Sequence, residues 1–132
     1  MINPSSKDFI AKARRVRKVF GGGMRQAGII AAGGIYALKN NLERLRDDHR
    51  RAKEIEGILA SKNWITKVLP VKTNIVVGHL SEGVSEYDVA AKIAEHGILC
   101  VPFGKGRIRF TTHLDITDED INFLSDKLPD QL

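Results

Sequence analysis

Two arginines alternate with apolar residues in the stretch "RIRFTTHL", near the C-terminal end of the 132-residue chain. Arg107 and Arg109 stand two positions apart, so in a strand they share one face, while Ile108 and Phe110 point to the other. A guanidinium held on a rigid strand can bind a carboxylate through two parallel hydrogen bonds. The alternative is an ordinary solvated sheet face, and the pattern by itself favours that alternative.

A second candidate is the glycine-rich stretch "KVFGGGMRQAG", which begins at Lys18. Gly22 and Gly23 lie just before an expected helix start, where free amides and the helix dipole favour an anion such as phosphate, and Arg25 could add a charge-assisted hydrogen bond. The stretch matches neither the dinucleotide fingerprint G-x-G-x-x-G nor the P-loop. A simple hinge between two helices is the alternative explanation of these glycines.

Other kinds of site are absent from the sequence pattern. The single cysteine, Cys100, excludes an intrachain disulfide, fits a reducing compartment such as the cytoplasm, and lies in an apolar run typical of a small core residue. No carboxylate pair, zinc-spaced cluster or hydrolase triad is apparent. No apolar stretch reaches the roughly 18 residues of a membrane span. We therefore expect a cytoplasmic protein without a metal site or a membrane segment.

The N-terminal half, residues 1–62, predicts three helices. The first covers residues 5–20 and is capped by Ser5 or Ser6. The second, residues 24–40, is apolar all round, which is typical of a helix buried on every side. The third is amphipathic, with Asn40 or Asn41 as its cap. Because the rest of the chain offers limited cover for the second helix, we expect self-association through it or packing against a neighbouring domain.

The charge is unevenly distributed: the net charge is +5, and basic residues dominate residues 1–62 while acidic ones slightly outnumber them in 63–132. The basic segment "KARRVRK" could lie along nucleic-acid phosphates. Aromatic residues are few and do not interleave with it, and no known nucleic-acid-binding motif stands out. A nucleic-acid-binding module therefore stays an alternative that the sequence does not favour.

The C-terminal half, residues 63–132, predicts a small domain. Residues 64–80 are rich in β-branched residues and indicate one or two strands around Pro70. Ser85 with Asp88, and Thr117 with Asp120, have the spacing of helix capping boxes. Two further strands are expected on either side of the segment "GKG". The predicted fold class is α+β, an α/β sandwich in which a helical N-terminal region precedes a β-α-β-β-α domain with a mostly antiparallel sheet.

Together these motifs carry a resemblance. The segment "SKDFIAKARRVRKVFGGGMRQAGIIAAGG" resembles the region that follows the cofactor lysine in low-specificity L-threonine aldolases, and "RIRFTTHLDITDEDI" resembles the late strand and final helix of that family. The resemblance extends from about Ser6 to Leu128. It implies the aspartate-aminotransferase-like fold, the cofactor pyridoxal phosphate (PLP), and the cleavage of β-hydroxy amino acids into glycine and an aldehyde.

The resemblance also implies roles for particular residues. Arg109, which heads the pattern R-x-x-T-H, would hold the α-carboxylate of a small amino-acid substrate. Arg25, with Gly22, Gly23 and Lys18 nearby, would lie close to the cofactor phosphate.

The family's Schiff-base lysine and its large cofactor domain match nothing in these 132 residues. We therefore expect the C-terminal part of such an enzyme, inactive and without bound PLP on its own, either as a homo-oligomer or completed by a large domain. A non-catalytic partner or oligomerisation subunit is the alternative.

Overall fold

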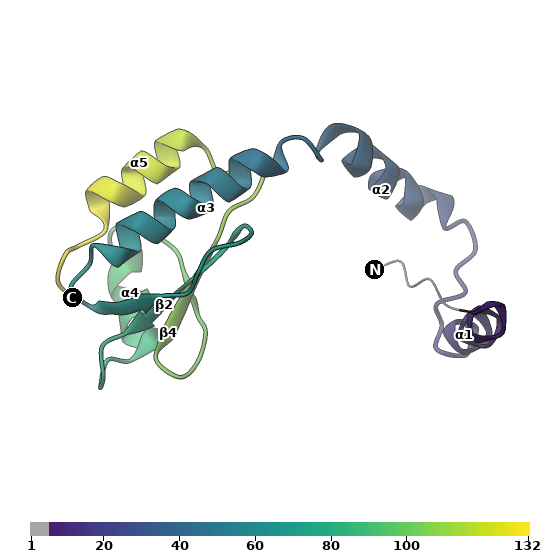
Figure 1. Ribbon diagram of the computed structural model, residues 1–132, viewed down its shortest axis with the longest axis horizontal. Helices are drawn as coiled ribbons and strands as arrows, with labels where there is room; N and C mark the ends of the chain where they lie inside the picture. The colour runs from purple at the N-terminus through teal and green to yellow at the C-terminus, as the bar shows by residue number, and fades with distance from the viewer. Residues whose placement is uncertain (1–5) are drawn as a thin grey trace. The chain divides into compact units, whose positions relative to one another are not determined.

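The computed structural model describes residues 6–132, so the alternative helix cap at Ser5 lies outside the described residues. Internal contacts divide the chain into two compact units, Met1–Leu42 and Glu43–Leu132 (Figure 1). The first unit is helical. The second contains the sheet and three further helices, which confirms the predicted α+β class.

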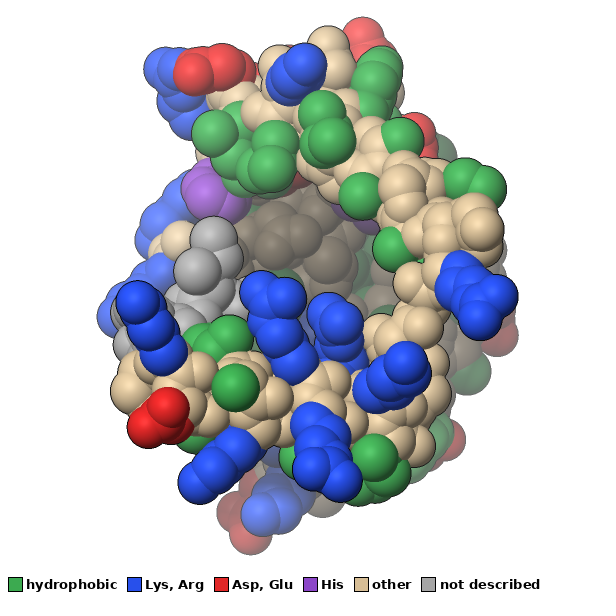
Figure 2. Space-filling view, turned by 90° about the vertical axis from the view of Figure 1, so that its right-hand side faces the viewer, with side chains coloured by type: hydrophobic (Ala, Val, Ile, Leu, Met, Phe, Trp, Pro, Cys, Tyr) green, Lys and Arg blue, Asp and Glu red, His purple; other side chains and the backbone are tan. Residues whose placement is uncertain are grey.

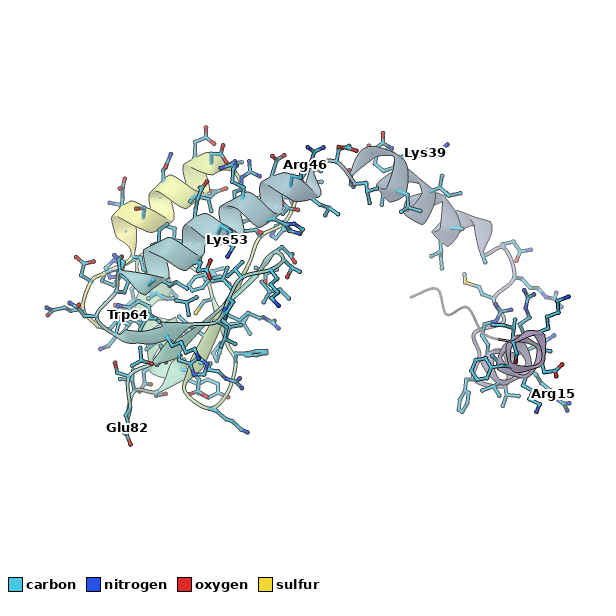
Figure 3. All side chains as sticks on the ribbon, in the orientation of Figure 1. Arg15, Lys39, Arg46, Lys53, Trp64 and Glu82 are labelled. Carbon is cyan, nitrogen blue, oxygen red and sulfur yellow. The ribbon has the colours of Figure 1, made fainter. Side chains whose placement is uncertain are left out.

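In the first unit, helix α1 (Lys7–Val19) begins at Ser6, whose Oγ accepts a hydrogen bond from the Phe9 amide at 3.3 Å. This confirms Ser6 as the cap. None of the residues of α1 is buried. Its Lys and Arg side chains gather around the helix, with hydrophobic side chains between them (Figure 2), and Arg15 extends away from it (Figure 3).

The glycines after α1 end the helix in a defined way. Gly21 adopts the left-handed region at φ +78°, and its amide donates to the Lys18 carbonyl oxygen at 3.2 Å. The Gly22 amide donates to the Arg17 carbonyl oxygen at 2.8 Å. This pair of bonds is the Schellman motif, which satisfies carbonyls that a helix end leaves free. The run of glycines is therefore first of all a helix stop.

Helix α2 (Gly28–Asn40) starts later than the predicted residue 24, because Gln26 takes a positive φ of +51° that a helix does not continue through. None of its residues is buried. This exposure agrees with the limited cover expected from the rest of the chain, and the self-association expected through this helix stays a prediction. Large apolar side chains are exposed along it: Ile29, Ile30, Ile35, Tyr36 and Leu38.

The second unit is built on a four-stranded antiparallel sheet of order β1-β2-β4-β3, with three helices. The strands are β1 (Ile65–Val68), β2 (Ile75–Leu80), β3 (Val101–Pro102) and β4 (Arg107–Thr111), and the helices are α3 (Leu45–Ala60), α4 (Glu86–Ala94) and α5 (Asp118–Lys127). Two strands precede α4, which settles the choice between one and two and makes the order β-β-α-β-β-α. The strand expected before the segment "GKG" is confirmed only over two residues, Val101–Pro102.

One face of the sheet holds the core. Gly78 of β2 lies opposite Ile108 of β4, and a Cβ at Gly78 would stand 2.9 Å from Cδ1 of Ile65, so a larger residue there would require the Ile65 side chain to shift. Buried residues from all three helices join this cluster: Ala52, Ile55, Leu59, Val89, Ile93, Ile121 and Leu124. The other face carries the two arginines of β4 together with His79 and two apolar residues of β2, Ile75 and Val77.

The helix caps predicted from the sequence can be compared with the structure in this unit. The capping box of Thr117 and Asp120 is confirmed, with both reciprocal hydrogen bonds present. Ser85 caps α4 by accepting from the Asp88 amide. The predicted asparagine cap of the third helix is wrong: α2 runs on to Asn40, and α3 begins only at Leu45 without a side-chain cap.

Helix α3 packs on β1, β2 and α5, and so belongs to the compact unit of the sheet. Arg46 and Lys53 extend from α3, and Trp64 precedes β1 (Figure 3). The division of the chain into domains at 62/63 stays a prediction. Within residues 6–132, no helix combines the length and apolarity needed to span a bilayer.

Candidate functional site

The predicted alternation along β4 is confirmed. Ile108 is 0% and Phe110 is 6% exposed, both on the core face, whereas Arg107 and Arg109 are half-buried on the opposite face. The register places Arg109 between Val77 of β2 and Val101 of β3. Val77 is only 8% exposed although it lies on the same face of the sheet as the two arginines. The stem of Arg109 is thus held between two apolar neighbours that limit its freedom.

The side chain of Arg107 forms hydrogen bonds to the turn that joins β3 to β4. Its Nε donates to the Gly104 carbonyl oxygen at 3.0 Å, and its Nη2 donates to the Phe103 carbonyl oxygen at 3.4 Å. The Phe103 amide donates in return to the Arg107 carbonyl oxygen at 2.8 Å. Arg107 therefore closes the turn and has fewer donors left for a ligand.

Arg109 has a different environment. Its Nε is buried, and it donates a hydrogen bond to no residue among 6–132. Among the described residues Arg109 also forms no ion pair, although carboxylates are common in this unit. Leaving a buried donor unpaired costs about 1–3 kcal/mol, more for a charged group. A guanidinium in this state is suited to an anion supplied from outside.

The two guanidinium groups share one aromatic ring. The Cζ atoms of Arg107 and Arg109 each lie 5.1 Å from the centroid of the Phe103 ring, within the range of a cation–π contact. Beside Arg109 is an open pocket of about 230 Å³, lined by Leu99, Cys100, Val101, Phe110, Thr111 and His113. This volume admits a small molecule such as an amino acid, so Arg109 is the centre of the candidate site.

The remaining residues of the pattern R-x-x-T-H have separate functions. Thr112 is 0% exposed, and its Oγ1 donates to the Asp48 carbonyl oxygen of α3 at 2.7 Å. Asn74 donates from Nδ2 to the Thr112 carbonyl oxygen at 2.7 Å and accepts from the Thr112 amide at 3.0 Å. His113 is exposed and accepts from the Asp115 amide through Nδ1. Thr112 thus anchors the end of β4 to α3, while His113 borders the pocket.

The predicted phosphate residues lie in the first unit. Lys18 and Arg25 are exposed. A Cβ at Gly22 would stand 2.8 Å from Cγ and 3.1 Å from the carbonyl oxygen of Arg17, so a larger residue would crowd the turn, whereas one at Gly23 would stand 3.1 Å from Cγ of Lys18 and would require only a small shift of that side chain. The Gly22 amide is already used in the helix stop. The sequence predicts that these glycines end the first helix, and the hydrogen bonds of Gly21 and Gly22 confirm it.

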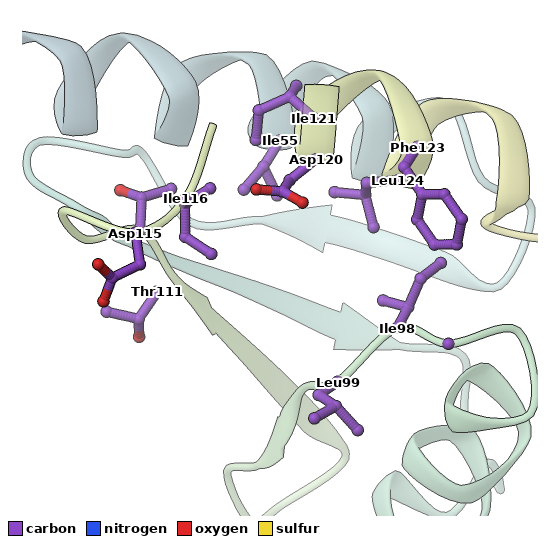
Figure 4. Close-up of a pocket in the computed structure, with 12 residues that line it drawn as sticks. Ile55, Ile98, Leu99, Thr111, Asp115, Ile116, Asp120, Ile121, Phe123 and Leu124 are labelled. Carbon is purple, nitrogen blue, oxygen red and sulfur yellow. The ribbon is translucent and has the colours of Figure 1, made fainter. Parts of the chain in front are cut away.

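A larger pocket was not predicted from the sequence. Its volume is about 360 Å³, and it lies between α3, α5 and the loops before β3 and after β4, with Ile55, Ile98, Leu99, Ile116 and Phe123 among its lining residues and Asp115 at its edge (Figure 4). Its residues come from four separate segments. No local pattern could have indicated it.

Cys100 is partly buried against the core, and this burial raises the pKa of its thiol to about 11. This agrees with its interpretation as a packing residue. In the part of the chain that the structure describes, no group of three His, Cys, Asp or Glu side chains could hold a metal ion.

Comparison with known proteins defines the class. Residues 4–82 match the beta-eliminating lyase family, and the chain belongs to that family. Over 121 residues it is 36% identical to low-specificity L-threonine aldolase 1 of Arabidopsis thaliana, covering 89% of this chain and 34% of the relative. It is 38% identical over 120 residues to the low specificity L-threonine aldolase of Escherichia coli, covering 88% of this chain and 33% of that protein. The chain thus spans about a third of the length of these relatives.

Proposed function

We propose that this chain forms the C-terminal part of a PLP-dependent aldolase that cleaves β-hydroxy amino acids into glycine and an aldehyde. The observation that carries the proposal is Arg109, which pairs with Val77 and Val101 on the neighbouring strands and whose buried Nε donates to no residue among 6–132. An amino-acid α-carboxylate offers the two oxygens that such a group prefers. The curated relatives named as threonine aldolases support the same reaction class.

In this proposal Arg109 binds and orients the substrate carboxylate. A fixed orientation matters because the bond to be broken must be aligned with the cofactor, and positioning alone can supply a large part of a rate enhancement. The partial burial of Arg109 beside the buried Val77 lowers the local dielectric and so strengthens its interaction with an anion. PLP, when bound, supplies the electron sink for the cleavage.

The residues proposed for the cofactor phosphate fit it in part. Lys18 and Arg25 are exposed cations, and Arg25 precedes the positive N-terminal end of α2. Gly22 fits less well, because its amide bonds to Arg17, so a phosphate contact through that amide requires the bond to break. We therefore assign the phosphate to the side chains of Lys18 and Arg25, with Gly23 permitting close approach.

We further propose that the 132 residues alone have no aldolase activity, because no residue matches the family's Schiff-base lysine. With added PLP and L-threonine, the chain should release glycine no faster than free PLP does. A faster rate would contradict this proposal.

The role of Arg109 is tested in a chimera in which this chain replaces the matching third of the Escherichia coli relative. Acetaldehyde release from L-threonine is measured at saturating PLP. Arg109→Ala should lower kcat/KM by at least about 30-fold, as expected for loss of a desolvated charge partner. Arg46→Ala, which removes an exposed arginine of α3, is the matched control and should change it less than about twofold.

Two outcomes would contradict the proposal. If the chimera binds PLP and folds but cleaves no L-threonine, the aldolase assignment is wrong. If Arg109→Ala retains activity close to that of the control variant, the carboxylate role of Arg109 is wrong.

An oligomerisation or partner subunit is the second candidate, favoured by the exposed apolar side chains of α2. Ile35→Glu on α2 should then convert an assembly into monomers in light scattering. A basic nucleic-acid-binding module is the third, and it rests on the exposed Lys and Arg residues of α1 (Figure 2). It requires salt-dependent retention on DNA or RNA, and absence of retention at low salt removes it.

A further inference from the structure

Phe103 has an unusual position for a large apolar side chain. It is 40% exposed, yet its ring lies against the cationic face of the sheet rather than in the core. Two guanidinium groups contact it at the same 5.1 Å distance. An aromatic face attracts cations through its quadrupole, whereas an aliphatic side chain of similar size does not.

The turn that carries Phe103 is anchored on three sides. The Gly106 amide donates to Oε2 of Glu86 in α4 at 3.3 Å, and the Gly106 carbonyl oxygen accepts from the Leu80 amide of β2 at 2.8 Å. Arg107 braces the third side through the Gly104 carbonyl oxygen. Three successive residues, 104–106, have positive φ, which makes the turn tight. The Phe103 ring is therefore presented from a fixed backbone.

The two arginines consequently differ in what fixes them. Arg107 is held by hydrogen bonds to the turn. Arg109 forms no such bonds among the described residues, and its guanidinium lies over the Phe103 ring. A side chain fixed before its ligand arrives loses less conformational freedom on binding and binds more tightly.

We propose that Phe103 is a positioning residue for Arg109: its ring, presented by the turn that Arg107 braces, holds the Arg109 guanidinium ready for a carboxylate. This inference rests on the proposed function of Arg109 as the carboxylate ligand. Nothing in the sequence pattern indicates it, because Phe103 precedes the R-x-x-T-H segment and lies outside β4.

The test uses the 132-residue chain and NMR of its arginine Nε–Hε groups. Protons held over an aromatic face shift upfield, so Arg109 Hε should resonate upfield of an exposed arginine and exchange slowly with water. Phe103→Leu should remove the upfield shift and speed the exchange, whereas Phe103→Tyr, which keeps the ring, should preserve both. Phe123→Leu is the matched control, because Phe123 of α5 is similarly exposed at 44% and lines the other pocket.

Glycine then serves as the carboxylate probe, followed through the same Arg109 signal. Phe103→Leu should raise the apparent Kd for glycine about two- to fivefold, the size of an exposed cation–π contact. Phe103→Tyr and Phe123→Leu should leave it unchanged. The amide spectrum of each variant verifies that the sheet is intact.

The outcomes separate the two proposals. If Phe103→Leu leaves the Arg109 signal and its exchange unchanged, or if Phe103→Tyr behaves like Phe103→Leu, the positioning role is overturned. If Arg109 depends on the ring but glycine never perturbs its signal, the positioning role is supported and carboxylate binding by the 132 residues alone is excluded; Arg109→Ala in the chimera then decides the proposed function separately.

Discussion

Replacing Thr112 with valine should destabilise the sheet-containing unit through the loss of one hydrogen bond. Thr112 is fully buried, and its Oγ1 donates to the Asp48 carbonyl oxygen of α3 at 2.7 Å. Valine has nearly the same shape, so no cavity forms. The Asp48 carbonyl also accepts from the helix backbone four residues on, so it is not left wholly unpaired. We therefore expect a loss of about 0.5–1.5 kcal/mol, the net value of one buried hydrogen bond.

The assay is urea unfolding followed by fluorescence of Trp64, the single tryptophan of the chain, which is 5% exposed and belongs to this unit. With a denaturant slope of about 1–3 kcal/mol per molar, the midpoint should fall by roughly 0.3–1 M. Thr111→Val is the matched control, because Thr111 is the exposed neighbour in the same strand and should change the midpoint little.

A third variant separates bonding from packing. Thr112→Ser keeps the hydroxyl and deletes a methyl group, so its loss measures packing alone, at about 1 kcal/mol. If Thr112→Val is no less stable than Thr111→Val, the hydrogen bond to α3 contributes nothing, and the assignment of Thr112 as the anchor of β4 is wrong.

Three further predictions follow from the second unit. Lys62→Met should lower the free energy of unfolding by about 2–3 kcal/mol in the same urea assay, because the buried ammonium donates at 2.7 Å to a backbone carbonyl and to a carboxylate of the C-terminal segment. Lys53→Met, at an exposed site of α3, is the control and should lower it much less. Equal losses for the two variants would contradict this prediction. Hydrogen bonds from two arginines of α3 lower the pKa of Asp118 below its usual 3.8, so its carboxylate stabilises the fold above that pH and this stabilisation is lost as the pH falls through the lower folded-state pKa. Asp118→Asn should therefore make the free energy of unfolding less dependent on pH in the acid range. An unchanged pH dependence would refute this prediction. Cys100, with a pKa of about 11, should react with iodoacetamide at pH 8 roughly 100-fold more slowly than a free cysteine, and rapid labelling would show that its burial is not maintained.

Patterns confined to a few neighbouring residues predicted the local structure of this protein well. The Thr117 cap, the Ser6 cap and the alternation around Ile108 depend on chain geometry over one helical turn or one strand, so the sequence contains all that is needed. The asparagine cap failed for a related reason. Asn40 and Asn41 satisfy the local rule, but the backbone of α2 continues to Asn40 and places the helix boundary elsewhere.

The candidate site illustrates the opposite case. The sequence alone placed Arg107 and Arg109 on one strand face but could not distinguish their roles, and the resemblance to the aldolases selected Arg109. The structure adds a physical difference between them, because the turn carbonyls that engage Arg107 and the ring of Phe103 are positioned by contacts to α4 and β2. Those contacts join residues some 20 or more positions apart, which no local pattern encodes.

By itself, therefore, the sequence determined the α+β class, the helix ends that depend on local caps, the polar and apolar faces of β4 and the membership of the beta-eliminating lyase family. Only the tertiary structure decided that Thr112 ties β4 to α3 and that Arg109 lacks an acceptor among the described residues. The physical reason is the separation along the chain between the residues that interact. Caps and strand faces follow from bonds between near neighbours, whereas the pairing of a buried donor depends on which distant segments the packed core brings beside it.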